Sequence, residues 1–200
     1  MSRLRVYHRV GAGRPIRVVW TLEEVGADYE LVTLSAEQAR DAEHRARHPL
    51  GRVPVLEDEH GPMFESTALV FHIAELYPDA GLLPPAGTHE RAVVQGWSIF
   101  AMTELEAPAV ESFRQREANP EASAKAAARC VEAVAALEGA LSGATPYLVG
   151  SRFSVADIVA CRVLVLAAGV GAIVLSPACA AYKESLTSRP AHQLAAAKLQ

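Results

Sequence analysis

The sequence lacks a basic tract. Its 200 residues carry 19 Lys and Arg against 23 Asp and Glu, which gives a formal net charge of −4 at pH 7. Binding to nucleic acids and to anionic membranes normally depends on clustered positive charge. We therefore expect no nucleic-acid partner and no electrostatic attachment to a membrane.

Long apolar runs are missing too. The longest uncharged apolar stretch, residues 163–175, falls short of the ~20 residues that a membrane span needs. The opening segment, MSRLRVYHR, has neither the apolar core nor the small-residue cleavage site of a signal peptide. These absences predict a cytoplasmic protein that does not cross a membrane.

Cysteine is scarce. Cys130, Cys161 and Cys179 are odd in number, widely spaced and set among alanines in helical context. We predict buried, reduced thiols, as expected in the cytoplasm. None lies near the motifs described below, which argues against a catalytic cysteine.

Strand and helix patterns alternate in the first part of the chain. Residues 4–8 and 29–34 have strand character and flank a helix that begins near Pro15. This order implies a parallel strand pair joined by a right-handed crossover. The glycine-containing turn before the helix is not a dinucleotide-binding motif, because Ile16 stands where the third glycine would be.

The chain changes character after a proline-containing loop, residues 79–87. From Thr88 onward the strand signals vanish and alanine-rich helical patterns take over. The spacing predicts a long helix over residues 88–118 that is bent near Pro108. A capping box farther on pairs Ser154 with Asp157, and we assign this pair to stability.

Residues 48–77 hold the most informative chemistry. A proline, Pro54, stands among apolar strand-forming residues, where it cannot donate an N–H to a ladder. Such a strand lies at an edge or is interrupted, and a cis bond before Pro54 would turn the backbone of Val53 outward. Val53 could then pair with an extended peptide.

Glu65 and Ser66 stand where a short strand pattern passes into a helix. The hydroxyl of Ser66 and the positive end of the helix favour a carboxylate ligand, and Glu65 suits an ammonium group. Together with Val53, these groups match a small peptide with a free amino-acid end. Glutathione is such a molecule.

Segments spread over almost the whole chain resemble the bacterial cytosolic glutathione S-transferase family. They are RVVWTLEEVGADYELV, HPLGRVPVLED, ESTALVFHIAELYP and YLVGSRFSVADIVA. The resemblance implies an α/β thioredoxin-like, glutathione-binding N-terminal domain over residues 1–80. An all-α helical C-terminal substrate domain over residues 88–200 would follow. It also implies a homodimer that acts in detoxification.

The resemblance assigns the binding residues as follows. Val53 pairs with the cysteinyl part of glutathione, Pro54 is the cis proline, and Glu65 and Ser66 hold the γ-glutamyl end. Arg52 stands where relatives often carry a Lys or Arg near the glycyl carboxylate. Glutathione is then the co-substrate, and a small apolar electrophile is the second substrate.

The group that makes the thiol reactive follows less directly from the resemblance. Relatives use a Tyr at the end of the first strand, or a Ser or Cys in the turn after it. Here the serine position falls on Ala12 and the cysteine position on Arg14, and neither side chain does the same job. Tyr7 is the favoured donor, with His8 on the opposite strand face. Arg14 and the backbone N–H of Gly13 are the other candidates.

The expected function is conjugation of the glutathione thiolate to small apolar electrophiles. Two alternatives stay open: a glutathione-dependent peroxidase, and a non-catalytic protein that binds glutathione or a partner, which Ala12 favours. No metal is expected. His44 and His48 have helical spacing but lack a third ligand, and we predict a solvated pair.

Overall fold

The computed structural model describes residues 4–141 and 145–200, which divide between two compact units. The chain up to Gly81 forms the first unit together with Arg189–Gln200, and Leu82–Ser188 form the second. The sequence analysis assigned residues 189–200 to the helical domain. They belong to the first unit instead, because α9 (Pro190–Lys198) packs against α1 (Pro15–Val25).

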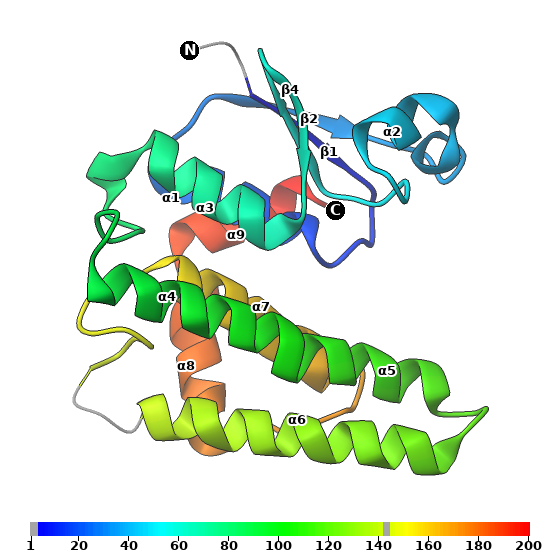
Figure 1. Ribbon diagram of the computed structural model, residues 1–200, viewed down its shortest axis with the longest axis vertical. Helices are drawn as coiled ribbons and strands as arrows, with labels where there is room; N and C mark the ends of the chain where they lie inside the picture. Colours follow the sequence, from blue (N-terminus) through cyan, green and yellow to red (C-terminus); the bar gives the residue numbers. More distant parts are fainter. Residues whose placement is uncertain (1–3, 142–144) are drawn as a thin grey trace. The chain divides into compact units, whose positions relative to one another are not determined.

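The first unit is a thioredoxin-like sheet of four strands in the order β2-β1-β3-β4, with α1 and α3 on one face and α2 on the other (Figure 1). Its strands are β1 (Leu4–His8), β2 (Tyr29–Thr33), β3 (Val55–Asp58) and β4 (Gly61–Phe64). Besides α1 and α9, its helical segments are η1 (Gln38–Arg40), α2 (Ala42–Arg47), α3 (Ser66–Leu76) and η2 (Pro78–Ala80).

Strand β1 is central to this sheet. It pairs in parallel with β2, which confirms the predicted strand-helix-strand unit, and antiparallel with β3. Between the parallel strands, α1 begins at Pro15 and ends at Gly26, whose φ of 66° suits a glycine. Strand alternation places Val6 and His8 on one face and Tyr7 on the other. The sheet therefore presents neighbouring β1 side chains to different surroundings.

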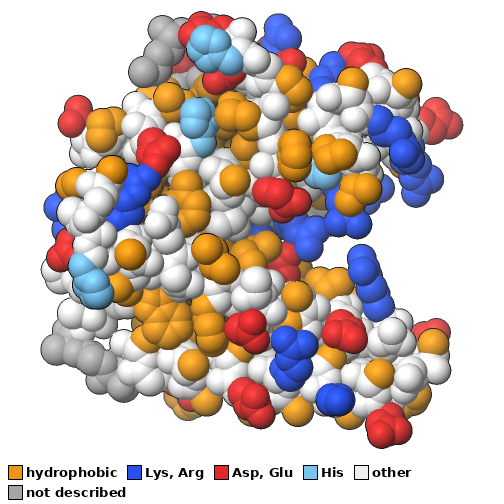
Figure 2. All heavy atoms as spheres, in the orientation of Figure 1, with side chains coloured by type: hydrophobic (Ala, Val, Ile, Leu, Met, Phe, Trp, Pro, Cys, Tyr) orange, Lys and Arg blue, Asp and Glu red, His pale blue; other side chains and the backbone are white. Residues whose placement is uncertain are grey.

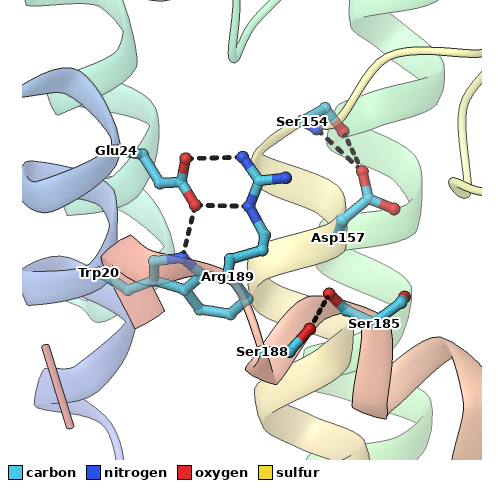
Figure 3. Close-up of polar contacts among 7 residues, drawn as sticks. All are labelled: Trp20, Glu24, Ser154, Asp157, Ser185, Ser188 and Arg189. Carbon is cyan, nitrogen blue, oxygen red and sulfur yellow. Dashed lines mark hydrogen bonds and ion pairs between the residues drawn. The ribbon is translucent and has the colours of Figure 1, made fainter. Parts of the chain in front are cut away.

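The last segment of the first unit is fastened to α1 by polar contacts (Figure 3). Arg189 donates from Nε and Nη2 to the two carboxylate oxygens of Glu24, at 2.6 and 2.8 Å. The indole N–H of Trp20 donates to the same carboxylate at 2.8 Å. His192 packs edge-on against the Trp20 ring, with 4.7 Å between ring centroids. A two-point guanidinium–carboxylate pair of this kind holds a defined orientation.

Every regular element that the structure describes in the second unit is helical. The elements are α4 (His89–Phe100), the π-helical segment η3 (Ala101–Glu106), α5 (Ala107–Gln115), α6 (Pro120–Leu141), α7 (Val155–Gly169) and α8 (Pro177–Thr187). The predicted long helix thus corresponds to α4, η3 and α5, with the irregular turns just before Pro108. Proline has no N–H for the preceding turn, and a wide turn accommodates its ring.

The three cysteines are free and buried, as predicted. Burial raises the pKa of each thiol, to about 12 for Cys161. The thiols therefore stay protonated and unreactive at neutral pH. In the described part of the chain, no helix combines the length and the apolar character that crossing a membrane requires.

Asp157 is the polar centre of the second unit. Its Oδ2 accepts hydrogen bonds from the N–H and the hydroxyl of Ser154, at 2.9 and 3.0 Å, and the predicted capping box is present (Figure 3). Its Oδ1 accepts from the N–H of Leu148 at 2.9 Å and from the hydroxyl of Tyr182 at 2.8 Å. Burial raises the pKa of this carboxyl, and the hydrogen bonds oppose the shift. One carboxylate thus joins the start of α7, the loop before it and α8.

We expect Asp157→Asn to lower the free energy of unfolding by about 3 kcal/mol, because the new amide N–H groups would face buried donors. Tyr182→Phe removes one of the bonds and should cost about 1 kcal/mol. Urea unfolding followed by circular dichroism measures both losses. Equal stability of Asp157→Asn and the unmodified protein would contradict the central role of this carboxylate.

Candidate functional site

An open cavity of about 290 Å³ lies in the first unit, beside the turn that follows β1. It brings together Ala12, Arg14, Arg52 and Val53, all predicted from the sequence as site residues. The other lining residues are Arg9, Gly13, Ala36, Ala39, Arg40 and Gly51. The cavity wall is therefore strongly basic, and its lining contains no carboxylate.

Pro54 determines whether the backbone N–H and C=O of Val53 can pair within the sheet beside this cavity. The ladder between β1 and β3 ends at the pair Tyr7–Val55, directly before Pro54, which has no N–H to extend it. The Val53–Pro54 bond is cis, as predicted. Across residues 4–141 and 145–200, no turn or loop hydrogen bond involves the backbone of Val53. Continuing the register places Arg9 opposite Val53, so both flank the cavity where the ladder stops.

His44 and His48 are buried, and the prediction of a solvated pair is wrong. The ring Nε2–H of His44 donates to the backbone carbonyl of Arg52 across 2.9 Å, and Nδ1 of His48 accepts from the N–H of Leu50 at 3.0 Å. Burial lowers the pKa of His48, and Glu65 opposes that shift. Both rings thus shape the loop that leads to Val53. Their helical spacing did not reveal that tertiary packing covers them.

Tyr7 lies outside this cavity. Its hydroxyl donates to the Glu57 carboxylate at 2.6 Å, and the Arg47 guanidinium lies 4.4 Å from its ring centroid. With Arg5 and Glu30, it lines a different cavity of about 370 Å³. Burial raises the pKa of Tyr7, and the hydrogen bond to Glu57 adds to the shift. The structure therefore separates Tyr7 from the site residues with which the sequence analysis grouped it.

The remaining candidates for thiol activation lie at the end of β1 and in the turn after it. His8 is only 1% exposed, and its Nε2 lies 2.8 Å from the hydroxyl oxygen of Thr33. Arg14 is different, because it is the N-cap of α1 and lines the cavity. The first turn of α1 contains no acidic residue. The positive charge of the Arg14 guanidinium and the positive end of the helix dipole therefore reinforce each other at this point.

Glu65 and Ser66 mark the start of α3 and are not part of the cavity lining. Ser66 is buried, and its hydroxyl oxygen accepts from the Arg17 guanidinium at 3.2 Å. Glu65 is exposed and has a φ of 70°, in the left-handed region that non-glycine residues seldom adopt. Such a conformation costs ~1–3 kcal/mol and is characteristic of binding and active sites.

Arg9 and Arg40 also line the cavity, although no local sequence pattern singles them out. Arg9 follows β1, and its place beside Val53 depends on the pairing of strands that are distant in sequence. Arg40 ends η1, within a stretch whose pattern indicates only a polar helix or loop. In the part of the chain that the structure describes, no cluster of three or more His, Cys, Asp or Glu side chains could hold a metal ion.

Family models agree with this architecture. The model described as "Glutathione S-transferase, N-terminal domain" matches residues 2–75, and the corresponding C-terminal domain model matches residues 100–190. The chain belongs to the glutathione S-transferase family. Glutathione S-transferase 4 of Zea mays is 31% identical to it over 188 residues, which cover 88% of this chain and 83% of that protein.

Solved structures of glutathione S-transferases have the same fold. A glutathione transferase from Methylococcus capsulatus superposes with a TM-score of 0.88 at 29% identity, over 98% of both chains. A sphingomonad glutathione S-transferase complexed with glutathione gives a TM-score of 0.85 at 29% identity, also over 98% of both chains. These likenesses confirm the predicted order of a thioredoxin-like domain and an all-helical domain.

The role of His44 in shaping the loop can be tested by His44→Phe. The loss of its hydrogen bond to Arg52 should lower the free energy of unfolding by about 1–2 kcal/mol and speed amide exchange in residues 48–54. Hydrogen-exchange mass spectrometry measures the second effect. His60→Phe, at an exposed turn position, is the matched control and should change neither quantity. Unaltered exchange in His44→Phe would show that the loop does not depend on this bond.

Proposed function

We propose that the protein binds glutathione in its first unit and transfers the glutathione thiolate to a small electrophile. The observation that carries this proposal is the backbone of Val53, without turn or loop hydrogen bonds among the described residues, beside a cavity lined by arginines. An extended peptide can pair with such a backbone, and guanidinium groups bind carboxylates in a two-point geometry.

Each part of glutathione has a matching group. The cysteinyl backbone pairs with Val53, and the glycyl carboxylate lies at Arg52 and Arg40. The γ-glutamyl end extends beyond the cavity to the start of α3, where the hydroxyl of Ser66 and the free N–H groups bind its carboxylate. The carboxylate of Glu65 takes its ammonium group.

Arg14 and the beginning of α1 stabilise the thiolate. A free thiol has a pKa of about 8.5, so the thiolate is a minority species at neutral pH. A guanidinium and a helix N-terminus beside the sulfur lower that pKa. Ala12 supplies no side-chain donor, and the Tyr7 hydroxyl is bonded to Glu57. The thiolate then attacks an electrophilic carbon, and the leaving group departs with its bonding electrons.

Other features support the wider proposal of a cytoplasmic, homodimeric detoxification enzyme. Leu50 and Phe64 are large apolar residues exposed on the first unit, as in a self-association surface. On α4, the half-buried rings of Trp97 and Phe100 pack edge-on, with 5.4 Å between ring centroids, and provide apolar surface within the second unit. The buried, free thiols fit a reducing compartment.

Calorimetric titration with glutathione tests the binding step. We expect Glu65→Gln to weaken binding about tenfold, because the ligand's ammonium group loses a charged acceptor. Glu59→Gln, at an exposed position in the turn between β3 and β4, is the matched control and should bind like the unmodified protein. Failure of the unmodified protein to bind glutathione would overturn the proposal.

Conjugation of a chloronitrobenzene tests the reaction. Arg14→Gln should lower kcat about tenfold or more, because the thiolate loses its cation, whereas Tyr7→Phe should stay within about twofold. The reverse sensitivity would instead assign thiol activation to Tyr7.

A second candidate function, binding without turnover, is favoured by Ala12. Glutathione binding without conjugation of any electrophile by the unmodified protein would support it.

A further inference from the structure

Three arginines of the first unit that lie away from the cavity form ion pairs with carboxylates. They are Arg5 with Glu30, Arg47 with Glu43 and Arg189 with Glu24. Among the described residues, Arg9, Arg40 and Arg52 make no side-chain ion pair with a carboxylate. Figure 2 shows Lys and Arg side chains, in blue, gathered on the edge of this unit near α2. The positive charge of Arg9, Arg40 and Arg52, which have no carboxylate partner among the described residues, is thus concentrated at the cavity.

Arg9 has a defined place among these cations. It follows directly on β1, and the β1–β3 register carries it opposite Val53. Arg14 borders the same turn as the N-cap of α1, a position that normally favours Ser, Asp or another acceptor. A cation there opposes the helix dipole, and such breaks of a local rule are expected at functional sites.

The anions of glutathione do not account for Arg9. Under the proposed function, the glycyl carboxylate lies at Arg40 and Arg52, and the thiolate at Arg14. The γ-glutamyl carboxylate lies at the start of α3, outside the cavity. Arg9 is then a fourth cation on the wall of the same cavity, and glutathione brings no anion for it. Like charges on one cavity wall repel, so a further anion would bind there favourably.

We propose that Arg9 receives an acidic group of the second substrate, so that the preferred electrophile is an anion such as an aryl or alkyl carboxylate. The inference rests on the proposed function and refines the expected apolar electrophile to an apolar body with one acidic group. In the reaction, the glutathione sulfur forms a bond to the electrophilic carbon, and a halide leaves with the electron pair. The carboxylate keeps its charge and its two-point contact with Arg9 throughout. Arg9 is therefore a specificity residue.

Two electrophiles of nearly the same shape, a chlorodinitrobenzoate and the corresponding chlorodinitrobenzamide, test this assignment at saturating glutathione. After division by the uncatalysed rates, kcat/KM should favour the benzoate by about tenfold or more. Arg9→Gln should remove the preference by slowing the benzoate alone. Arg114→Gln, at an exposed position of α5 in the second unit, is the matched control and should retain it. Equal use of both electrophiles by the unmodified protein would overturn the inference and leave the proposed function intact.

A binding measurement keeps the test independent of turnover. The unmodified protein, first saturated with the unreactive S-methylglutathione, is titrated calorimetrically with dinitrobenzoate and with dinitrobenzamide. Tighter binding of the benzoate that disappears in Arg9→Gln supports the inference, and equal affinities overturn it. Failure of S-methylglutathione to bind would overturn the proposed function instead. The same titrations on the free protein would then decide whether Arg9 binds the anion.

Discussion

The missing N–H of Pro54 is the constraint on which the site depends. Because proline cannot extend the β1–β3 ladder, pairing stops at Tyr7 and Val55. Val53 and Arg9 follow beyond this last pair, and both line the cavity. The cavity thus begins where the regular ladder ends.

Polar side chains at the cavity and elsewhere differ in how far their hydrogen bonds and charges are satisfied by other residues. Asp157 accepts hydrogen bonds from Ser154, Leu148 and Tyr182, and Glu24 is bonded by both Arg189 and a tryptophan N–H. These groups are fully engaged and stabilise their surroundings. Among the described residues, Arg9, Arg40 and Arg52 in the cavity instead have no carboxylate partner. Each unit thus has a polar network whose hydrogen bonds are satisfied, whereas the cavity of the first unit keeps positive charge available to a ligand.

Local rules were sufficient for much of the fold and for part of the site. Strand alternation, the glycine end of α1 and the capping box at Ser154 are short-range patterns, and the structure confirms them. The patterns did not show which side chains line one cavity, so Tyr7 was grouped with a cavity that it does not line. Burial of His44 and the position of Arg9 depend on tertiary packing and cross-strand register, which no short window contains.

Because residues 189–200 pack in the first unit, the order in which the two units complete their folding differs from their order along the chain. Chains grow from the N-terminus, and domains generally fold as units while they emerge. Here the thioredoxin-like unit cannot complete its packing when residue 81 appears, because the helix that covers α1 is made only after the entire helical unit. The ribosome therefore synthesises α7 and α8 before α9. The two units, although compact, are completed in the opposite order to their place in the sequence.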